Sequence, residues 1–330
     1  MSRSRAAFPS TAAGPPGFMD GSLIVPRAAD RERWPRNGRL SSMTRLVPPL
    51  AFLALLAGAC AGLGDGPIEH PTGKDQVILR VESGTVGLMH PMEVMNPGSP
   101  TLTLYGDGRL IVDEAEERSR FLTTFTVARL SEAGIQRLLD EAVDAGLQGE
   151  DRQLDASSGD DGDGTISVTL VSTGPTHVTS AWNLDGTGEE EEGLDGETLR
   201  GREELRGFLA KLEDVAGLVG EEMRSGPEPF EPGRWAVVWA AVRDPEQDGP
   251  WPAELVAEFR VRPWPLAPLA GWGEPLANVP TIRCTLVEGE DAEPLSSDLE
   301  DDTFWESDGV VYYVYARPLL PDEDRCSDVA

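Results

Sequence analysis

The sequence predicts an α+β protein: a mostly antiparallel sheet with two main helices, followed by a smaller β-rich lobe that is cross-linked by a disulfide. Three observations predict this class. Strand-like alternation between residues 76 and 222 is interrupted by two segments of helical periodicity. Further strand patterns follow from 230 to 330, and two cysteines fall in that last part. With 330 residues, 36 of them Gly and 27 Pro, the chain is long enough for one or two cores joined by many loops.

The N-terminal 60 residues contain an export signal. Met43-Thr44-Arg45 is a short basic start, residues 46–56 are apolar apart from Pro48-Pro49, and small residues lead to Cys60. This order is typical of a secretory signal peptide, and its apolar part is shorter than the roughly 20 residues that a membrane span needs. We therefore expect 43–59 to be a signal peptide and 1–42 to be a mis-called start or a disordered extension.

The end of this signal, Leu56-Ala57-Gly58-Ala59-Cys60, resembles the lipobox of bacterial lipoproteins, although Ala57 stands where Leu is commonest. The resemblance implies that Cys60 is lipidated on its thiol and becomes the new N-terminus. The alternative is an ordinary signal peptide that ends near a cysteine. The lipoprotein interpretation places the mature chain on the extracytoplasmic face of the cell membrane.

The charge excludes several classes of partner. The chain has 28 Lys and Arg against 58 Asp and Glu, a net charge of −30. Residues 60–330 hold 20 of the basic and 55 of the acidic residues, a net charge of −35. This excludes a nucleic-acid binder, which needs a basic footprint, and anionic lipid headgroups would repel the mature chain. We therefore expect the membrane to be a partner through a lipid anchor and not through a basic patch.

The mature chain begins with a tether over 60–75, rich in Gly and Pro, and an α+β domain over 76–222. Residues 77–81 predict a strand. The alternating residues 101–105 and 109–112 predict a hairpin around Gly106-Asp107-Gly108, because Gly and Asp tolerate the backbone of a tight turn. A further strand is expected over 121–127.

A helix is expected to begin after Ser131 as N-cap and to end at Gly146, with Ile135, Leu138, Leu139 and Ala142 on one face. Two strands follow, over 166–170 and 178–184. The second helix is expected over 197–216, and its inward residues are predicted to be Leu199, Leu205, Phe208, Leu209, Leu212 and Val215.

Residues 225–232 contain three prolines and predict a linker or an edge crossing. Strands in the β-rich C-terminal lobe, 230–330, are expected over 235–242 and 255–261, around Cys284, and over 310–315. In an exported chain Cys284 and Cys326 are expected to form a disulfide; two unpaired buried thiols are the alternative. Residues 317–323 are expected to wrap over the core, or to form an exposed recognition loop.

One segment has the composition of a metal site. Met89, His90, Met92 and Met95 place three thioethers at close spacing beside an imidazole, and soft sulfur ligands suit Cu(I). The alternative is that these Met side chains fill apolar gaps, which is their usual role. A copper-binding envelope protein is therefore an alternative function.

Other candidate motifs do not amount to a site. The acidic runs at 160–164 and at Glu189–Glu192 are expected to be solvated loops, since the first fails as a calcium loop at both end positions. His70, His90 and His177 are scattered, and the sequence contains no G-x-S-x-G, H-E-x-x-H or Rossmann glycine motif. The sequence thus assigns no catalytic residue and no cofactor, and it leaves the enzyme question open, with an unrecognised hydrolase as a further alternative.

Taken together, four motifs resemble uncharacterised exported lipoproteins of actinobacterial type. They are the lipobox, Pro71-Thr72-Gly73-Lys74-Asp75, Leu104-Tyr105-Gly106-Asp107-Gly108, and Arg317-Pro318-Leu319-Leu320-Pro321 with the nearby Cys326. The resemblance implies a location but no activity. We therefore expect a lipid-anchored, non-enzymatic binding or interaction module of the cell envelope, whose partner is an unidentified envelope protein or ligand.

Overall fold

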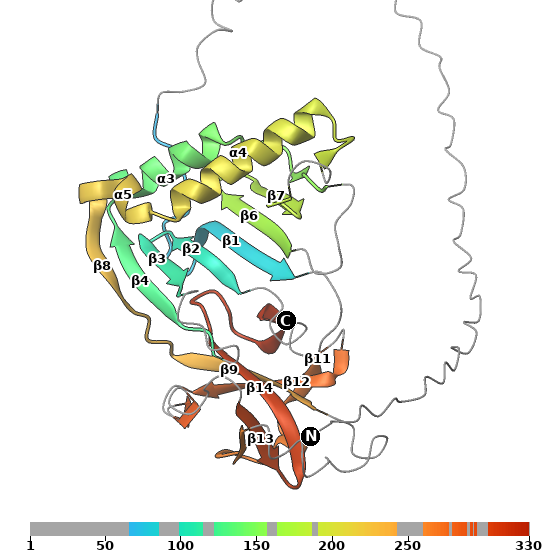
Figure 1. The fold of residues 1–330 in the computed structure, drawn as a ribbon. Coiled ribbons are helices and arrows are strands. Elements are labelled where there is room, and N and C mark those ends of the chain that lie inside the picture. The colour runs from blue at the N-terminus through green and yellow to red at the C-terminus, as the bar shows by residue number, and fades with distance from the viewer. Residues whose placement is uncertain are drawn as a thin grey trace, which may run out of the picture. The chain divides into compact units, whose positions relative to one another are not determined.

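The computed structural model describes residues 66–85, 99–114, 122–156, 164–186, 191–242, 260–276, 279–288, 291–292, 294–295 and 303–329. They belong to one compact unit, Asp65–Ala330. In this described part of the chain, three α-helices cover one face of a large sheet, and the C-terminal residues form a second sheet (Figure 1). The predicted α+β class is confirmed, as is the Cys284–Cys326 disulfide in the β-rich C-terminal region.

The first sheet has eight strands in the order β5-β7-β6-β1-β2-β3-β4-β8. Neighbours are antiparallel except β5 and β7, which run parallel. The strands are β1 (Val77–Thr85), β2 (Pro100–Tyr105), β3 (Arg109–Asp113), β4 (Phe125–Leu130), β5 (Arg152–Gln153), β6 (Gly164–Val171), β7 (Thr176–Trp182) and β8 (Met223–Pro229). The helices are α3 (Glu132–Asp144), α4 (Gly196–Leu212) and α5 (Val215–Val219), with the short 3-10 helix η3 (Gly220–Glu222) after them.

The second sheet has six strands in the order β10-β13-β14-β9-β12-β11, of which only β10 and β13 are parallel neighbours among the described pairs. Its strands are β9 (Arg234–Ala241), β10 (Arg260–Pro263), β11 (Glu274–Leu276), β12 (Val279–Glu288), β13 (Thr303–Ser307) and β14 (Val310–Pro318). Short 3-10 helices follow β10 and β14, η4 (Leu269–Gly271) and η5 (Cys326–Asp328).

The predicted hairpin around Gly106-Asp107-Gly108 is the turn between β2 and β3. Gly108 adopts φ +84°, which L side chains rarely adopt, and a Cβ there would lie 2.6 Å from the carbonyl oxygen of Leu130. The backbones of Gly108 and Leu130 also bond each other here: the Leu130 N–H donates a hydrogen bond to the Gly108 carbonyl oxygen at 2.8 Å. The turn thus needs glycine both for its conformation and for its contact with β4.

The expected helix after Ser131 is α3. The Ser131 hydroxyl accepts a hydrogen bond from the Gly134 N–H, and the residues predicted to face inward are buried. At the other end Gly146 adopts φ +69°, its N–H bonds the Val143 carbonyl, and the Leu147 N–H bonds the Ala142 carbonyl. This pair of bonds is the Schellman arrangement, which satisfies the last carbonyls of the helix.

The prediction of one helix over 197–216 is wrong. Helix α4 ends at Leu212, and Asp214 leaves the helical conformation so that its side chain accepts a hydrogen bond from the Gly217 N–H and starts α5. The inward assignment of Leu199 is also wrong, since it is 36% exposed. It lies in the first turn of α4, where Asp195 caps the helix at the surface.

Residues 225–232, expected as a linker or an edge crossing, contain most of a strand instead. β8 pairs antiparallel with β4 and is the last strand of the sheet. An edge strand has one side without ladder partners, so it accommodates Pro227 and Pro229, which lack an N–H. The strand predicted over 121–127 is likewise displaced along the chain, to Phe125–Leu130.

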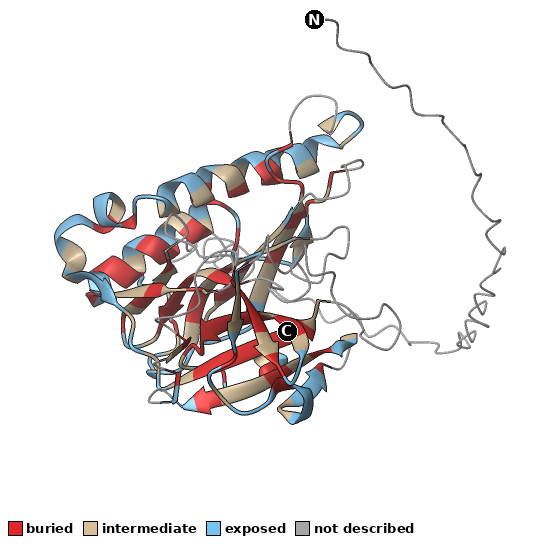
Figure 2. Cartoon of the chain, turned by 60° about the horizontal axis from the view of Figure 1, so that its bottom comes forward, coloured by how far each residue is buried: buried red, intermediate tan, exposed pale blue. Residues whose placement is uncertain are grey.

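The first sheet packs on both faces. Toward the helices, a cluster of buried aliphatic side chains joins the sheet to α3, α4 and α5, and the outer faces of these helices are exposed (Figure 2). On the opposite face, Tyr105, Ile111 and Phe125 pack with Leu320 from the C-terminal segment. Strands β2, β3 and β4 therefore have buried residues on both faces of the sheet.

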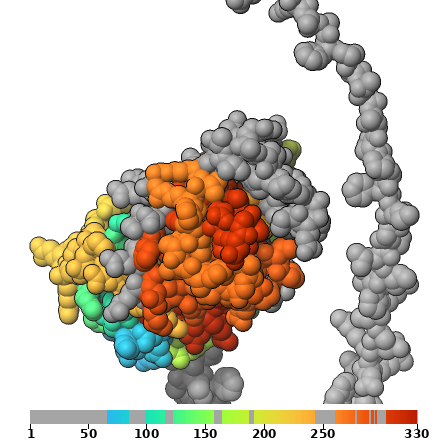
Figure 3. Space-filling view, turned by 90° about the horizontal axis from the view of Figure 1, so that it is seen from below, coloured from blue at the N-terminus to red at the C-terminus, as the bar shows by residue number. Residues whose placement is uncertain are grey.

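The two sheets contact each other through residues just before β4. The Thr123 N–H donates to the Ala316 carbonyl at 3.1 Å, and the Thr123 hydroxyl lies 2.5 Å from the Tyr315 hydroxyl. The C-terminal residues, coloured orange and red, gather on the surface seen from below (Figure 3). Direct hydrogen bonds thus link β14 to the chain that enters β4.

Candidate binding site

A cavity of about 770 Å³ opens at one end of the helix-covered face of the first sheet. Its apolar lining comes from six side chains: Val81, Leu102, Val112, Ile166, Leu209 and Leu212. Three carboxylates, Asp113, Glu114 and Glu213, and two hydroxyls, Ser83 and Thr101, complete the lining among the described residues. Its volume falls within the range of small-molecule sites.

Strand register brings the apolar residues together. Val81 pairs with Leu102, Leu102 pairs with Val112, and Ser83 pairs with Ile166, so one end of four adjacent strands forms the floor. Directly opposed residues in a sheet lie on the same face, here the face toward the helices. Leu209 and Leu212 reach this floor from the last turn of α4.

The end of α4 lies beside the cavity. The helix ends at Leu212, and the chain turns at Glu213 and Asp214 into α5. Val112, Ile166, Leu209 and Leu212 are packed against the core but only partly buried. Part of their apolar surface therefore lies at the cavity.

The three carboxylates differ in burial. Asp113 is 7% exposed and engaged within the protein. Glu114 is half-buried and accepts a 3.4 Å hydrogen bond from the Thr124 hydroxyl, whereas Glu213 is exposed at the end of α4. No Lys, Arg, His or Cys stands among the described lining residues. The described rim therefore carries negative charge.

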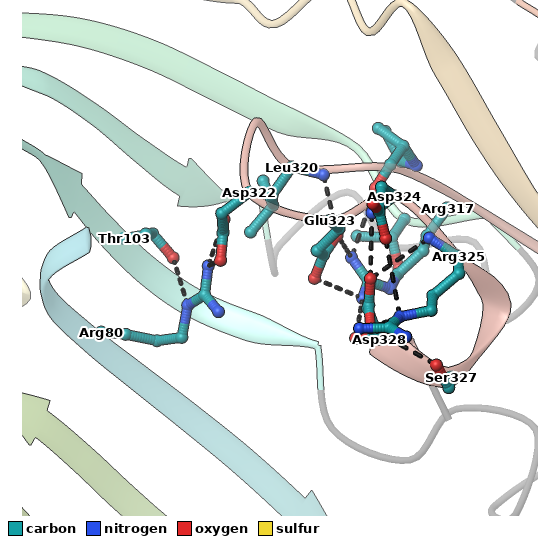
Figure 4. Close-up of polar contacts among 12 residues, drawn as sticks. Arg80, Thr103, Arg317, Leu320, Asp322, Glu323, Asp324, Arg325, Ser327 and Asp328 are labelled. Atoms are coloured by element: carbon teal, nitrogen blue, oxygen red, sulfur yellow. Dashed lines mark hydrogen bonds and ion pairs between the residues drawn. The ribbon is translucent and has the colours of Figure 1, made fainter. Parts of the chain in front are cut away.

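A second polar group of residues lies on the opposite face of the sheet. We call Arg80, Tyr105, Arg317, Asp322 and Glu323 the C-terminal polar cluster; all of them except Tyr105 are labelled in Figure 4. Arg80 donates two hydrogen bonds to Asp322, at 2.7 and 2.9 Å, and the Tyr105 hydroxyl donates to the same carboxylate at 2.6 Å. Burial, with the negative charge of Asp322, raises the pKa of Tyr105 above its ordinary value. Every carboxylate in this cluster has a cationic partner within the protein, so the cluster is structural.

The C-terminal segment that carries this cluster is buried rather than displayed. Arg317 and Glu323 are 2% and 5% exposed, and Leu319 and Leu320 are buried beside them. The predicted disulfide between Cys284 and Cys326 holds the end of the segment to β12, with 5.9 Å between the two Cα atoms. Of the two alternatives, the wrap over the core describes these residues.

The acidic run at 189–192 is not simply solvated, which corrects the expectation for Glu191. Arg202, which is fully buried, donates to Glu191 at 2.9 Å, and Arg206 donates to the same carboxylate oxygen. These hydrogen bonds lower the pKa of Glu191, that from Arg206 most. The two arginines also bind the loops around β7 through the carbonyl oxygens of Leu154, Trp182, Asn183, Leu184 and Gly186. The sequence signal for this interaction is the i, i+4 spacing of Arg202 and Arg206, which places both side chains on one face of α4.

Neither described histidine, His70 or His177, lies at the cavity. His70 is 8% exposed; one ring nitrogen lies 2.8 Å from the Pro71 carbonyl oxygen and the other 2.9 Å from a Glu132 carboxylate oxygen. The hydrogen bond from His70 lowers the pKa of Glu132. His177 lies on β7, away from the described lining of the cavity. The described residues do not bring either histidine to the cavity.

Several predicted site residues lie outside the described residues: Cys60, the proposed lipidation site, and Met89, His90, Met92 and Met95, the proposed copper ligands. The acidic residues 160–163 lie outside them as well. Within the described ranges, no group of three or more His, Cys, Asp and Glu is placed to hold a metal ion. None of the described helices is long and apolar enough to cross a membrane.

Comparison of the chain with protein-family models, with curated proteins and with solved structures finds no match.

Proposed function

We propose that this chain is a lipid-anchored extracytoplasmic protein of the cell envelope, that it acts as a non-enzymatic binding module, and that the cavity under the end of α4 is its ligand site. The observation that carries binding is the cavity itself: six apolar side chains line a volume of about 770 Å³.

The location is supported from two sides. Residues 43–60 have the order of a lipoprotein signal, with Cys60 at its end. The Cys284–Cys326 disulfide fits an oxidising compartment, because cytosolic reductants keep most protein thiols reduced. A lipid chain on Cys60 would hold an acidic protein at a membrane whose headgroups repel it.

The intact mass of the protein, taken from its native membrane before and after reduction, tests the location. We expect a chain that begins at Cys60 with added acyl mass and gains two hydrogens on reduction. Cys60→Ala is expected to abolish the acyl mass and release the protein from the membrane fraction. An unlipidated chain in the cytoplasmic fraction, with no mass change on reduction, would overturn the proposal.

Neither alternative function gains support from the described residues. The copper ligands Met89, His90, Met92 and Met95 lie outside them, so the copper site stays a prediction. A copper titration of wild-type protein against the Met92→Leu, Met95→Leu variant tests it directly. Equal, weak binding by both proteins would remove this alternative.

A further inference from the structure

We propose that the cavity under the end of α4 takes a cationic amphiphile, a ligand that joins an apolar chain or ring system to a positively charged organic head. This inference rests on the proposed function, because it names the ligand class of the same site. The inference follows from the positions of the apolar and acidic side chains of the cavity, and from the interactions that these side chains make within the protein.

The apolar part of the ligand would cover surface that the fold leaves open. Val81 and Leu102 are almost fully buried at the floor, whereas Ile166, Leu209 and Leu212 are only partly covered by the core. Apolar surface gains free energy when it leaves water, so an apolar ligand segment is favoured here. A bound apolar segment would thus extend the hydrophobic core between the first sheet and its helices.

The charged part of the ligand would lie at the margin, near Glu114 and Glu213. Glu114 follows the last residue of β3, and Glu213 follows the last residue of α4, so two different elements place carboxylates at the same cavity. Asp113 is engaged within the protein, so we rest no part of the proposal on it. The half-buried Glu114 carboxylate attracts a cation and repels an anion more strongly than it would in bulk water, and the exposed Glu213 carboxylate adds a weaker attraction of the same sign.

The comparison with the C-terminal polar cluster sharpens this point. In that cluster Asp322 pairs with Arg80, and Glu323 pairs with Arg317. The cavity, in contrast, has no Lys, Arg or His among its described lining residues.

A divalent metal is a poorer match than an organic cation, since no metal-binding group of His, Cys, Asp and Glu is found within the described ranges. The apolar floor also has no role in binding a bare ion.

A titration with three probes of nearly equal chain length tests the inference. The probes are decyltrimethylammonium, decyl maltoside and decanoate, each below its micelle-forming concentration, added to the full chain carrying Cys60→Ala. We expect decyltrimethylammonium to bind at one saturable site with a Kd about tenfold lower than that of decanoate at low ionic strength. The preference should shrink as salt screens the two exposed or half-buried carboxylates.

Variants assign the site. The Glu114→Gln, Glu213→Gln double variant is expected to lose most of the tenfold preference while still binding decyl maltoside. Ile166→Phe, which places a larger ring on the cavity floor, is expected to weaken the binding of all three probes. Glu203→Gln, an exposed acid elsewhere on α4, is the matched control and should change nothing. Thermal unfolding of each variant checks that its fold is kept.

The outcomes separate the inference from the proposed function. Equal binding of all three probes, weakened by Ile166→Phe, would overturn the cationic inference and leave the cavity as a ligand site. Many weak sites unaffected by the variants, or no binding at all, would overturn the inference as well. The proposed location fails only if the mass measurement finds no lipid on Cys60.

Discussion

Arg317 and Glu323 form a bidentate ion pair in which both side chains are almost fully buried, with 3% and 4% of their surface exposed. The two nitrogen–oxygen distances are 2.9 and 2.8 Å, and the Glu323 carboxylate also accepts from the Leu320 N–H at 2.8 Å. The pair joins two residues six positions apart in the chain. Arg317 is near the end of β14, and Glu323 lies between that strand and the disulfide at Cys326.

Breaking this pair should be costly. Glu323→Ala leaves the Arg317 guanidinium buried without its partner, and loss of one member of a buried pair typically costs about 3–5 kcal/mol of unfolding free energy. Urea unfolding of the oxidised protein measures it. The matched control is Arg325→Ala in the same segment. Its side chain is exposed and pairs with Asp324 and Asp328, and these surface pairs should contribute about 1 kcal/mol or less. Equal effects of the two substitutions would contradict a buried, tightly coupled pair.

Removing the disulfide should lower stability through the unfolded state. The bridge joins residues 42 positions apart, and the chain-entropy model gives about 4 kcal/mol for a loop of this length. The Cys284→Ala, Cys326→Ala variant is therefore expected to unfold at lower urea. Because Cys284 is fully buried and Cys326 is 4% exposed, reductant alone should act slowly on the native protein and quickly in urea. Rapid reduction without denaturant would count against this burial.

The Glu191 interaction predicts a pH dependence with a definite sign. Hydrogen bonds from Arg206 and Arg202 lower its pKa in the folded state, so its contribution to stability is present above the unfolded pKa of about 4.3. That contribution should be lost as pH falls through this value toward the lower folded pKa.

Urea unfolding of wild type and Glu191→Gln at pH 7 and pH 3 measures this linkage. The difference between the two proteins should be larger at pH 7. Glu192→Gln, at the exposed neighbouring position, provides the control and should differ from wild type by the same small amount at both values. A Glu191→Gln difference that grows on acidification would reverse the expected sign.

Two glycine substitutions should have opposite effects. Gly108→Ala forces a side chain into φ +84° and places a Cβ 2.6 Å from the Leu130 carbonyl oxygen, so we expect a loss of at least about 1–2 kcal/mol. Gly207→Ala lies within α4, where nothing stands within 4 Å of the new Cβ, and should gain about 0.5–1 kcal/mol. Thermal or urea unfolding reports both. Stabilisation by Gly108→Ala would show that this turn does not need glycine.

Local features of the fold were predictable from sequence because neighbouring residues determine them. The β2–β3 turn depends on Gly108, and the limits of α3 depend on the Ser131 cap and the left-handed Gly146. The break between α4 and α5 was missed because apolar periodicity continues across it to Val215. Only the hydrogen bond between Asp214 and Gly217, made in a non-helical conformation, interrupts the helix there.

Features that join distant parts of the chain were not predictable. β8 is an edge strand that pairs with β4, nearly one hundred residues earlier in the chain. Its prolines favour a linker when the sequence is considered alone, because local sequence does not reveal the edge position. The cavity requires Val81, Leu102, Ile166 and Leu209 to meet, and no local pattern specifies such a meeting. Glu191 looked solvated because its partners, Arg202 and Arg206, lie on the next helix.

The position of β1 has a mechanical consequence. Just before this strand, Ile68 exchanges two hydrogen bonds with Gln136 of α3 and His70 bonds Glu132, so a pull on the N-terminal side first meets these contacts. The load then reaches β1, a central strand hydrogen-bonded to β2 on one side and β6 on the other. Extending the chain beyond that point removes β1 from the sheet, which requires the hydrogen bonds to both neighbouring strands to break. The first strand that a pull from the N-terminal side reaches is thus one with two ladders to lose, whereas an edge strand has a single ladder.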